Sequence, residues 1–259
     1  MSNTGRVELI HARRGEILTL VRHHGELPVV ELSKLLGVSE VTVRSDLAAL
    51  AQTGQVRRTR GGVRLPTPGH GESPLEQTQH THTAAKRRIG REAAGLIQHG
   101  ETVILDVGST TTEVARALPL TLRNVTVVTN GLNIALELER LPNVRVIVTG
   151  GTLRPLQHSL VSPYALDVLR QVNADRLFLG CNGISAQGVT NANHEEAEIK
   201  RAMVAQSREV VVVADHSKLG HVSRAHVADA SQVAILITSR GGAPLPITLS
   251  DALPDIRIV

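Results

Sequence analysis

The apolar and polar positions follow different patterns in the two parts of this 259-residue chain. Up to about residue 65, apolar residues recur every three or four positions, which is the spacing of amphipathic helices. Further along, short apolar runs alternate with helical stretches, which is typical of βαβ units around a mainly parallel sheet. Residues 66–74 contain three prolines and two glycines and cannot continue a helix or a central strand. The pattern predicts a domain over residues 10–65, a linker over 66–83 and an open, mainly parallel α/β domain over 84–259.

The first domain is predicted to contain three helices. The apolar residues expected to face its core are Ile17, Leu18, Leu20 and Val21 in the first helix (13–23), Val30, Leu32, Leu35 and Leu36 in the second (29–36), and Val43, Leu47 and Leu50 in the third (40–52). Gly37 can adopt the left-handed conformation that ends a helix, and Ser39 is a good N-cap for the helix that follows. Two short helices joined by a turn that contains glycine form the helix-turn-helix pattern.

The third helix and the segment after it carry the residues expected to contact DNA. The N-terminal part of a recognition helix lies nearest to the base edges in the major groove. Residues 55–65 contain four arginines and no acidic residue, and they are predicted to form a β-hairpin that turns at Gly61-Gly62 and lies along phosphates. The expected DNA-binding residues are Ser39, Val41, Thr42, Arg44, Ser45, Arg57, Arg58 and Arg60. The alternative is a three-helix domain for protein contacts, with a solvated arginine-rich face.

Charge and aromatic content favour double-stranded DNA as the partner. Residues 1–70 hold ten Lys and Arg against six Asp and Glu, whereas residues 71–259 hold eighteen of each. This asymmetry suits a small nucleic-acid-binding module attached to a neutral domain. Tyr164 and Phe178 are the only aromatic residues of the Phe, Tyr and Trp types. The chain therefore lacks the stacking platforms that readers of RNA and single strands use.

Other features bear on the compartment of the protein. No apolar run approaches the roughly 20 residues needed to cross a bilayer, and charged residues near the N-terminus leave no room for a signal peptide. Cys181 is the single cysteine, which excludes an intramolecular disulfide framework and a multi-cysteine zinc site. We expect a soluble, cytoplasmic protein that does not associate with membranes.

Five predicted strands of the second domain end in small or polar residues. They are Thr102–Leu105 before Asp106, Val125–Val128 before Thr129-Asn130, Val144–Val148 before Thr149-Gly150-Gly151, Leu177–Leu179 before Gly180-Cys181-Asn182, and Val210–Val213 before Ala214-Asp215. The carboxyl ends of parallel strands share one edge of a sheet, and ligands bind in the crevice outside that edge. The sequence therefore predicts a small-molecule site there.

The segment Gly108-Ser109-Thr110-Thr111-Thr112 has the composition of a phosphate-binding turn. A glycine lets the backbone approach a ligand closely, hydroxyls and amides donate hydrogen bonds, and the N-terminus of a following helix favours an anion. The segment is neither a Walker A loop nor a dinucleotide-binding fingerprint. A helix cap rich in Ser and Thr is the alternative.

Both domains resemble the DeoR family of repressors. In the first domain the resemblance rests on Arg13, Ile17-Leu18, residues 31–47 and Arg60-Gly61-Gly62; in the second it rests on Lys86, Ile89, Asp106–Thr111, Thr129-Asn130, Gly150-Gly151, Asp175, Phe178–Gly180, Asn182–Ile184 and Ala214–Lys218. The family usually has a second arginine where this chain has Ser45, so the operator sequence is expected to differ from the usual ones. Asn182 and Ser239 stand where the family usually or often has Asp, and the arginine that often follows the linker is missing near Gln79.

The resemblance implies a sensor domain similar in fold to ribose-5-phosphate isomerase and glucosamine-6-phosphate deaminase. It implies phosphate at Ser109–Thr112 and sugar hydroxyls near Asp215 and Lys218. The effector-binding residues expected on this basis are Asp106, Gly108, Ser109, Thr110, Thr111, Asn130, Gly150, Gly151, Asn182, Glu195, Lys200, Asp215 and Lys218, with Arg154 as a neighbour. Glu195 and Lys200 could equally form an exposed helical pair.

The predicted function is a DNA-binding repressor of carbohydrate-metabolism genes, released from its operator by a phosphorylated sugar. Binding to repeated operators implies a homodimer or a higher homo-oligomer. Activation in place of repression stays open. The alternative is a sugar-phosphate isomerase or deaminase with an appended DNA-binding domain, but the loop that would carry the catalytic base has Asn182.

No cofactor and no metal are predicted. The pairs His23-His24 and His80 with His82 lack the companion ligands of a zinc site. Cys181 is interpreted as a small packing residue and not as a redox sensor.

Overall fold

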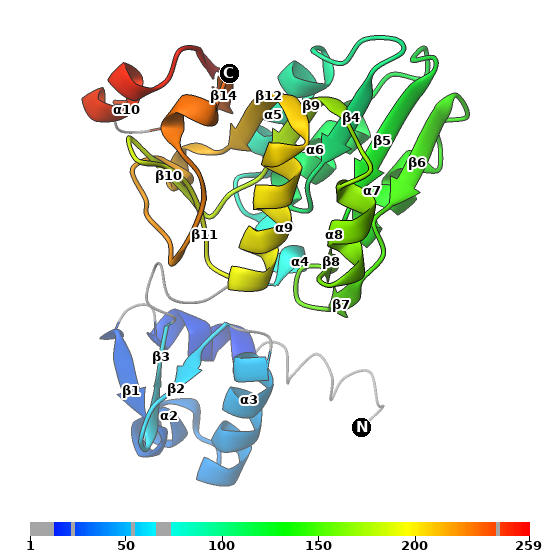
Figure 1. Cartoon of the computed structure of the whole chain (residues 1–259). Helices are drawn as coiled ribbons and strands as arrows, with labels where there is room; N and C mark the ends of the chain where they lie inside the picture. The colour runs from blue at the N-terminus through cyan, green and yellow to red at the C-terminus, as the bar shows by residue number, and fades with distance from the viewer. Residues whose placement is uncertain (1–12, 22–23, 53–54, 66–73, 242–243) are drawn as a thin grey trace. The chain divides into compact units, whose positions relative to one another are not determined.

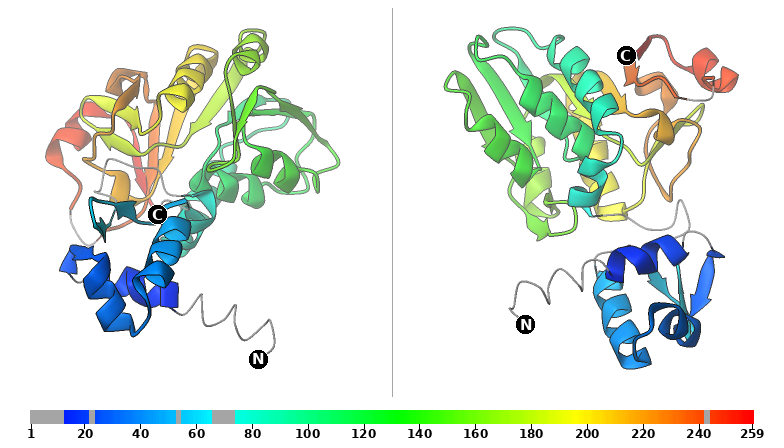
Figure 2. Two further views of the ribbon diagram at one scale, coloured as in Figure 1. Left: turned by 90° about the horizontal axis from the view of Figure 1, so that it is seen from below. Right: turned by 180° about the vertical axis from the view of Figure 1, so that it is seen from behind.

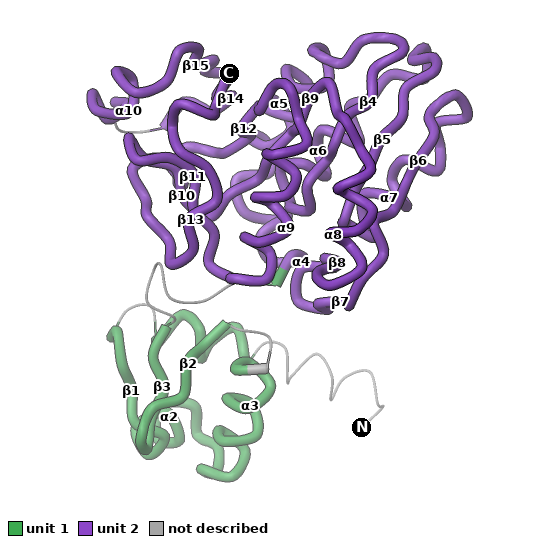
Figure 3. Tube along the Cα trace, viewed as in Figure 1, with its two compact units in different colours: residues 1–74 green, residues 75–259 purple. Residues whose placement is uncertain are grey.

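The computed structural model describes residues 13–21, 24–52, 55–65, 74–241 and 244–259. The chain divides into two compact units, Met1–Pro74 and Leu75–Val259 (Figure 3). Each unit has a hydrophobic core of its own. The fold class predicted from the sequence, a winged helix-turn-helix followed by an open, mainly parallel α/β domain, is confirmed.

The first unit is a small helical domain with a three-stranded sheet (Figure 1). Residues 13–21 are helical, and the elements that follow are β1 (Glu26–Pro28), α2 (Val29–Leu36), α3 (Glu40–Gln52), β2 (Arg57–Arg58) and β3 (Gly62–Arg64), with strand order β1-β3-β2. The helices α2 and α3 have the predicted bounds. Gly37 ends α2 in the left-handed conformation at φ 64°, and the Thr42 backbone N–H donates to Ser39 Oγ at 3.2 Å, which makes Ser39 the predicted cap.

The core of this unit differs from the prediction in one helix. Val43, Leu47 and Leu50 of α3 are buried as predicted. In α2, however, Leu32 is buried together with Val29, while Val30 and Leu35 are about half exposed. The prediction for Val30 and Leu35 was wrong because α2 has only eight residues, and so short an apolar run fits more than one helical face.

The strand β1 was not predicted. It pairs antiparallel with β3, so that Leu27 lies opposite Val63. A segment of three residues that ends in proline carries little strand signal of its own. The pairing depends instead on the hairpin formed far along the chain.

The second unit is built on a seven-stranded parallel sheet (Figure 1). Its helices are α4 (Leu75–His80), α5 (Thr83–Ala94), α6 (Ser109–Ala117), α7 (Leu132–Leu138), α8 (Tyr164–Leu169), α9 (His194–Ala205) and α10 (Ile247–Ala252), with short 3-10 turns η1 (His216–Lys218) and η2 (Ala230–Gln232). The sheet strands are β4 (Thr102–Leu105), β5 (Val125–Thr129), β6 (Val144–Val148), β9 (Ala174–Leu179), β12 (Ser207–Ala214), β14 (Ile235–Thr238) and β15 (Ile256–Ile258), in the order β15-β14-β12-β9-β4-β5-β6. All five predicted strands are therefore present.

Helices cover both faces of this sheet (Figure 2). Side chains alternate along each strand, so that in β4 the residues Val103 and Leu105 pack with α5, α6 and α7, whereas Ile104 packs with α8 and α9. Two small antiparallel sheets complete the unit: β7 (Thr152–Arg154) with β8 (Ser159–Val161), and β10 (Gly183–Ser185), β11 (Gly188–Asn191) and β13 (Ala225–Ala228). Among the described residues, no helix is both long enough and apolar enough to span a membrane.

The linker predicted over 66–83 is longer than the connection in the structure. Residues 75–80 form α4 and belong to the second unit. Leu75 is buried, and its backbone N–H donates to the Leu156 carbonyl oxygen at 2.9 Å. The sequence of α4 is polar and a single buried leucine attaches the helix to the second unit, so its membership of that unit could not be predicted.

Candidate functional site

The predicted recognition helix presents a polar, exposed surface at its start. Val41 is 75% exposed, and Arg44 and Ser45 are also exposed. Thr42 is partly buried, and its hydroxyl lies 2.9 Å from the Ser39 hydroxyl within the cap. Arg44 forms an ion pair with Glu40, one turn earlier, at 3.0 Å. The first two turns of α3 therefore offer hydrogen-bond donors and an apolar contact, which is the mixture that base edges require.

The arginines of the hairpin also face solvent. Arg57 and Arg58 lie on β2, and Arg60 lies in the turn. Gly61 adopts φ 92°, and the Thr59 N–H donates to the Gly62 carbonyl oxygen at 3.0 Å, so the chain reverses at the predicted place. Three exposed guanidinium groups on a short hairpin are suited to phosphate contacts.

Asp46 ties the first helix to the recognition helix, a role that the sequence analysis missed. Its two carboxylate oxygens accept the Nε–H groups of Arg13 at 2.6 Å and of Arg14 at 2.9 Å. The Asp46 side chain is only 3% exposed. The position of α3 in this unit therefore depends on an ion-pair network as well as on apolar packing.

In the second unit, Asp106 lies at the centre of the carboxyl edge of the sheet. It follows β4, next to the end of β9, and its Oδ2 accepts the backbone N–H of Gly180 at 3.0 Å. Lys200 reaches this carboxylate from α9 as an ion pair and also donates to the Gly180 carbonyl oxygen at 3.0 Å. Lys200 is therefore a buried partner of Asp106 and not part of an exposed helical pair.

The Asp106 carboxylate is fully buried and incompletely satisfied. Burial raises its pKa to about 6 against the attraction of Lys200. Burial lowers the pKa of Lys200, but the attraction of Asp106 and Glu196 outweighs this effect and raises it overall. The second oxygen, Asp106 Oδ1, has no hydrogen-bond partner among the described residues. A buried acceptor without a partner is costly, so a donor from a ligand or a water would stabilise this position.

The segment predicted as a phosphate loop forms the first turn of α6. Gly108 precedes the helix at φ 154°, and the hydroxyls of Thr111 and Thr112 donate to its carbonyl oxygen at 3.0 and 2.6 Å. Both threonines are buried. These hydroxyls bond a carbonyl and not the free N–H groups of the helix start, and no side chain caps α6, so the Ser/Thr cap of the alternative interpretation does not form here. The backbone N–H groups of Ser109, Thr110 and Thr111 belong to the part of a helix that has no intrahelical acceptor.

Other predicted residues follow the neighbouring strands. Asn130 Oδ1 accepts the Val107 N–H at 3.0 Å, and Asn182 Oδ1 accepts the Ala192 N–H at 2.9 Å, so both amides shape loops of this edge. Gly150 and Gly151 follow β6 with positive φ. A Cβ at Gly151 would lie 2.1 Å from the Val161 carbonyl oxygen, which only glycine avoids.

The glutamate buried near this edge is Glu196, and not Glu195. Glu196 Oε1 accepts the Ser159 hydroxyl at 2.6 Å and pairs with Arg154, whose guanidinium links it to the β7–β8 hairpin. The Glu195 side chain is 64% exposed and lies 3.8 Å from Arg154. Successive helical residues point about 100° apart, so the start of α9 at its cap, Asn193, decides which glutamate faces inward.

The end of β12 forms a second charged group around Asp215. Asp215 Oδ1 accepts the Ser217 N–H at 3.0 Å, and its Oδ2 lies 4.0 Å from Lys86 Nζ. Burial lowers the pKa of Lys86 to about 8, although Asp215 opposes the shift. The positive charge of Lys218 also acts on this group of residues, since it lowers the pKa values of Lys86 and Asp215. Lys86 was noted in the family resemblance but was not predicted as a site residue.

Neither the single cysteine nor the histidines form a reactive or metal-binding centre among the described residues. Burial raises the pKa of the Cys181 thiol to about 12, so its thiol is not reactive at neutral pH. In the part of the chain that the structure describes, no three His, Cys, Asp or Glu side chains gather so as to hold a metal ion. His23 lies outside the described residues.

Two family matches cover both units of the chain. Residues 13–68 match the DeoR-like helix-turn-helix domain. Residues 81–240 match the DeoR C terminal sensor domain. The matched ranges contain the exposed surface of α3, the hairpin and the whole carboxyl edge around Asp106.

Curated relatives are similar over almost their full length. A putative aga operon transcriptional repressor of Escherichia coli O157:H7 is 36% identical over 249 residues, which cover 93% of this chain and 92% of that protein. The glycerol-3-phosphate regulon repressor of Escherichia coli K12 is 34% identical, with 95% of this chain and 96% of that protein covered. Among solved structures, ribose 5-phosphate isomerase A from Methanocaldococcus jannaschii aligns with a TM-score of 0.41 at 16% identity, over 54% of this chain and 55% of that chain. That structural likeness is too low to support a conclusion about activity.

Proposed function

The chain belongs to the DeoR family of transcriptional regulators, and from this premise we propose that it represses genes of carbohydrate metabolism until a phosphorylated sugar binds its second unit. The predictions of a DNA-binding regulator, and of a protein that is not an enzyme, are confirmed by the family matches and by the relatives named above. The alternative of an isomerase or deaminase is therefore set aside. The identity of the effector, the residues that bind it and the direction of regulation belong to the proposal.

For DNA, the proposal assigns α3 to the major groove and the hairpin to the phosphates. Val41, Thr42, Arg44 and Ser45 lie on the exposed start of α3. Arg57, Arg58 and Arg60 carry charge without an acidic neighbour in their segment. Base contacts specify a sequence and phosphate contacts position the protein, and the two surfaces provide one kind each. Operator DNA in the cytoplasm is the expected target.

For the effector, the observation that carries the proposal is the unpartnered oxygen of Asp106 next to the start of α6. Asp106 Oδ1 can accept a sugar hydroxyl, while the free amides of Ser109, Thr110 and Thr111 can hold a phosphate at the positive end of the helix. Lys200, which forms an ion pair with this carboxylate, supplies a buried positive charge. Lys86 and Lys218, close to Asp215, add positive charge near the end of β12.

Repression is relieved if the effector binds the conformer that fits the operator less well. A ligand shifts such an equilibrium only by its differential affinity for the two states. One helix-turn-helix unit supplies limited affinity, so we expect a homodimer or a higher homo-oligomer to bind repeated half-sites.

The test is a thermal-shift screen against phosphorylated sugars and their unphosphorylated forms, followed by an operator-release assay. The chain has no Trp, so an external dye or calorimetry is required. We expect one phosphorylated sugar to raise the melting temperature and to release operator DNA. The variant Ser109→Glu places a carboxylate where the phosphate is expected and should abolish both effects. The matched change Ser250→Glu, on the exposed side of α10, should leave both intact.

Two outcomes would contradict the proposal. If no phosphorylated sugar changes the melting temperature, DNA binding stands but the second unit is not a sugar-phosphate sensor. If Ser109→Glu binds the effector as well as the wild-type chain does, the start of α6 is not the phosphate site.

A further inference from the structure

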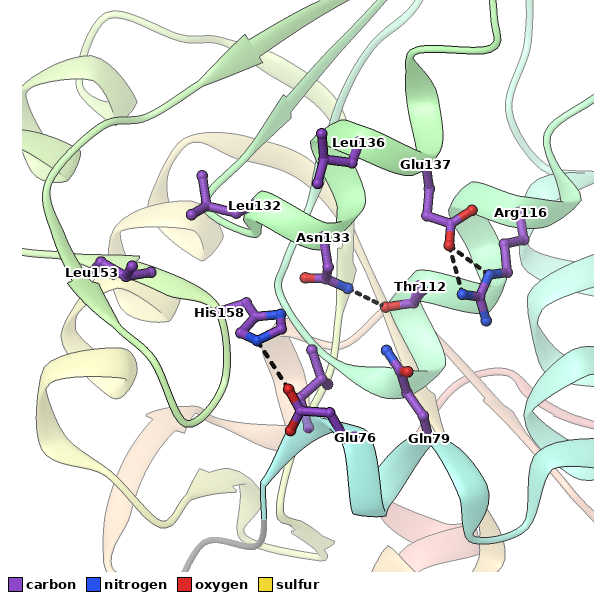
Figure 4. Close-up of a pocket in the computed structure, with 11 residues that line it drawn as sticks. Glu76, Gln79, Thr112, Arg116, Leu132, Asn133, Leu136, Glu137, Leu153 and His158 are labelled. Carbon is purple, nitrogen blue, oxygen red and sulfur yellow. Dashed lines mark hydrogen bonds and ion pairs between the residues drawn. The ribbon is translucent and has the colours of Figure 1, made fainter. Parts of the chain in front are cut away.

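A further cavity lies beside α4 in the second unit. It has a volume of about 590 Å³ and opens between α4, α6, α7 and the β7–β8 hairpin (Figure 4). Pockets of about 300–1,000 Å³ are typical of small-molecule sites. We call it the α4 pocket. Its lining includes Gln79, Thr112, Asn133, Leu132 and Leu153, with ion pairs at its rim.

The charged groups around the α4 pocket are already paired. Arg116 binds Glu137 at 2.5 Å and Glu113 at 2.8 Å. His158 Nε2 lies 3.0 Å from a carboxylate oxygen of Glu76 on α4. The cation Arg116 is thus held by two carboxylates, so a phosphate would have to compete with both of them. This lining disfavours an anionic ligand.

The other polar groups in the α4 pocket are neutral and partly unused. Asn133 Nδ2 donates to Thr112 Oγ1 at 2.7 Å, which fixes the orientation of its amide. Its Oδ1 has no partner among the described residues. The Gln79 side chain points from α4 toward these two residues (Figure 4) and makes no hydrogen bond that the described part of the chain provides. Two amides beside leucine side chains match a ligand with hydroxyl groups and apolar C–H faces.

We propose that the α4 pocket is a second ligand-binding site, for an uncharged hydroxylated molecule such as an unphosphorylated sugar or a polyol. The ligand's hydroxyls bind the amides of Gln79 and Asn133, and its C–H groups pack on Leu132 and Leu153. This site uses neither Asp106 nor the free amides of α6, so its ligand contacts can be tested apart from those of the proposed sugar-phosphate site, although Thr112 of the same helix turn lines the pocket.

A ligand in the α4 pocket is expected to affect regulation by stabilising α4. This helix is the first element after Pro74, the last residue of the DNA-binding unit. It is attached to the sensor unit by Leu75, by the pair of Glu76 with His158, and by the Thr78 carbonyl oxygen, which accepts Lys86 Nζ at 2.5 Å. A ligand that contacts Gln79 on one wall and Leu153 on the other adds a further attachment. We expect it to reduce local opening of α4.

The experiment combines calorimetric titration with hydrogen exchange measured by mass spectrometry on the full-length chain. The probes are glucose, galactose, sorbitol and glycerol, each compared with its own phosphate ester. We expect one neutral probe to bind and to slow amide exchange in residues 75–80 several-fold. The variants Gln79→Leu and Leu153→Ser, on opposite walls, should each weaken this binding about tenfold, because each removes one ligand contact. The control Gln98→Leu changes an exposed glutamine outside the pocket and should leave the affinity unchanged.

Several results would overturn this proposal. One is that none of the neutral probes binds at millimolar concentration; another is that binding occurs but is indifferent to both wall variants. If exchange in residues 75–80 slows with protein concentration and not with added probe, a second copy covers the pocket instead. A phosphate ester that slows exchange only around residues 106–111 supports the proposed function and leaves this test unaffected, so failures of the two proposals are distinguishable.

Discussion

Replacing Lys200 with methionine removes one half of the buried ion pair at the carboxyl edge of the sheet. The side chains of Lys200 and Asp106 are only 3% and 0% exposed. Methionine fills a similar length but leaves Asp106 with the Gly180 N–H as its remaining partner. Breaking a buried pair from one side costs roughly 3–5 kcal/mol, because an uncompensated charge stays behind. That is a large part of the roughly 5–15 kcal/mol that holds a domain folded.

The loss should depend on pH in a defined direction. Burial raises the pKa of Asp106 to about 6 in the folded chain, whereas an unfolded aspartate titrates near about 3.9. The stability that this carboxyl contributes is therefore complete below pH about 4 and is lost as the pH rises through about 6. Without Lys200 the folded pKa rises further, and the proton stays on Asp106 at higher pH. Lys200→Met should therefore destabilise the chain less at pH 5 than at pH 8.

Urea unfolding followed by far-ultraviolet circular dichroism measures this effect at both pH values. The control Arg208→Met breaks an ion pair with Asp175 in which the arginine is 80% exposed, and it should cost no more than about 1 kcal/mol. The double variant Asp106→Asn with Lys200→Met has no charge left at either position of this pair, so its loss should be smaller than the sum of the single losses. Equal losses at pH 5 and pH 8, together with additive single losses, would refute the reasoning.

Three further predictions concern DNA contacts, the first helix and the effector site. Arg44→Ala should cost about 1–3 kcal/mol of binding to the specific operator only, whereas Arg58→Ala should weaken all DNA and lower the salt slope by about one, both measured by titration at several salt concentrations. Asp46→Ala removes the acidic partner of two arginines that are 22% and 30% exposed. The free energy of unfolding of the first unit should fall by about 2 kcal/mol, and operator binding should be lost while effector binding is retained. Intact operator binding would contradict this prediction. Because the pKa of Lys86 is about 8, affinity for a phosphorylated sugar should fall as the pH rises through that value. The variant Lys86→Arg keeps its charge, so its affinity should not fall over this range. A pH-independent affinity in the wild-type chain would exclude Lys86 from the site.

Much of the fold could be predicted because local and long-range signals agree. The bounds of α2 and α3 and the cap at Ser39 follow from residue types that act within one turn of helix. The strands β4, β5, β9 and β12 of the main sheet are short, mostly buried apolar runs followed by polar residues, and β6 is a similar but less buried run. Alternation with helices then leaves a parallel sheet as the consistent topology.

The features that could not be predicted depend on contacts between distant segments. β1 exists because β3 pairs with it, and α4 is attached through Leu75 to a hairpin about eighty residues later. In the sequence, Asp46 resembles any other acidic residue of a helix, and its role depends on the packing of the first helix, which places Arg13 and Arg14 beside it. Glu195 and Glu196 are neighbours of the same type, and only the start of α9 separates their roles.

The hydroxyl bonds in the turn at Ser109–Thr112 leave the backbone amides of this turn without a side-chain acceptor. Thr111 and Thr112 already donate their hydroxyl protons to Gly108, so these side chains have no proton left for a phosphate. The same bonds hold the first turn of α6 rigid, and a rigid turn keeps its free amides aimed at one point. The threonines therefore serve an anion indirectly, by fixing the backbone that would bind it. Specificity for one sugar must then come from groups around the rest of the edge, where Asp106 Oδ1 is a buried oxygen that has no partner among the described residues.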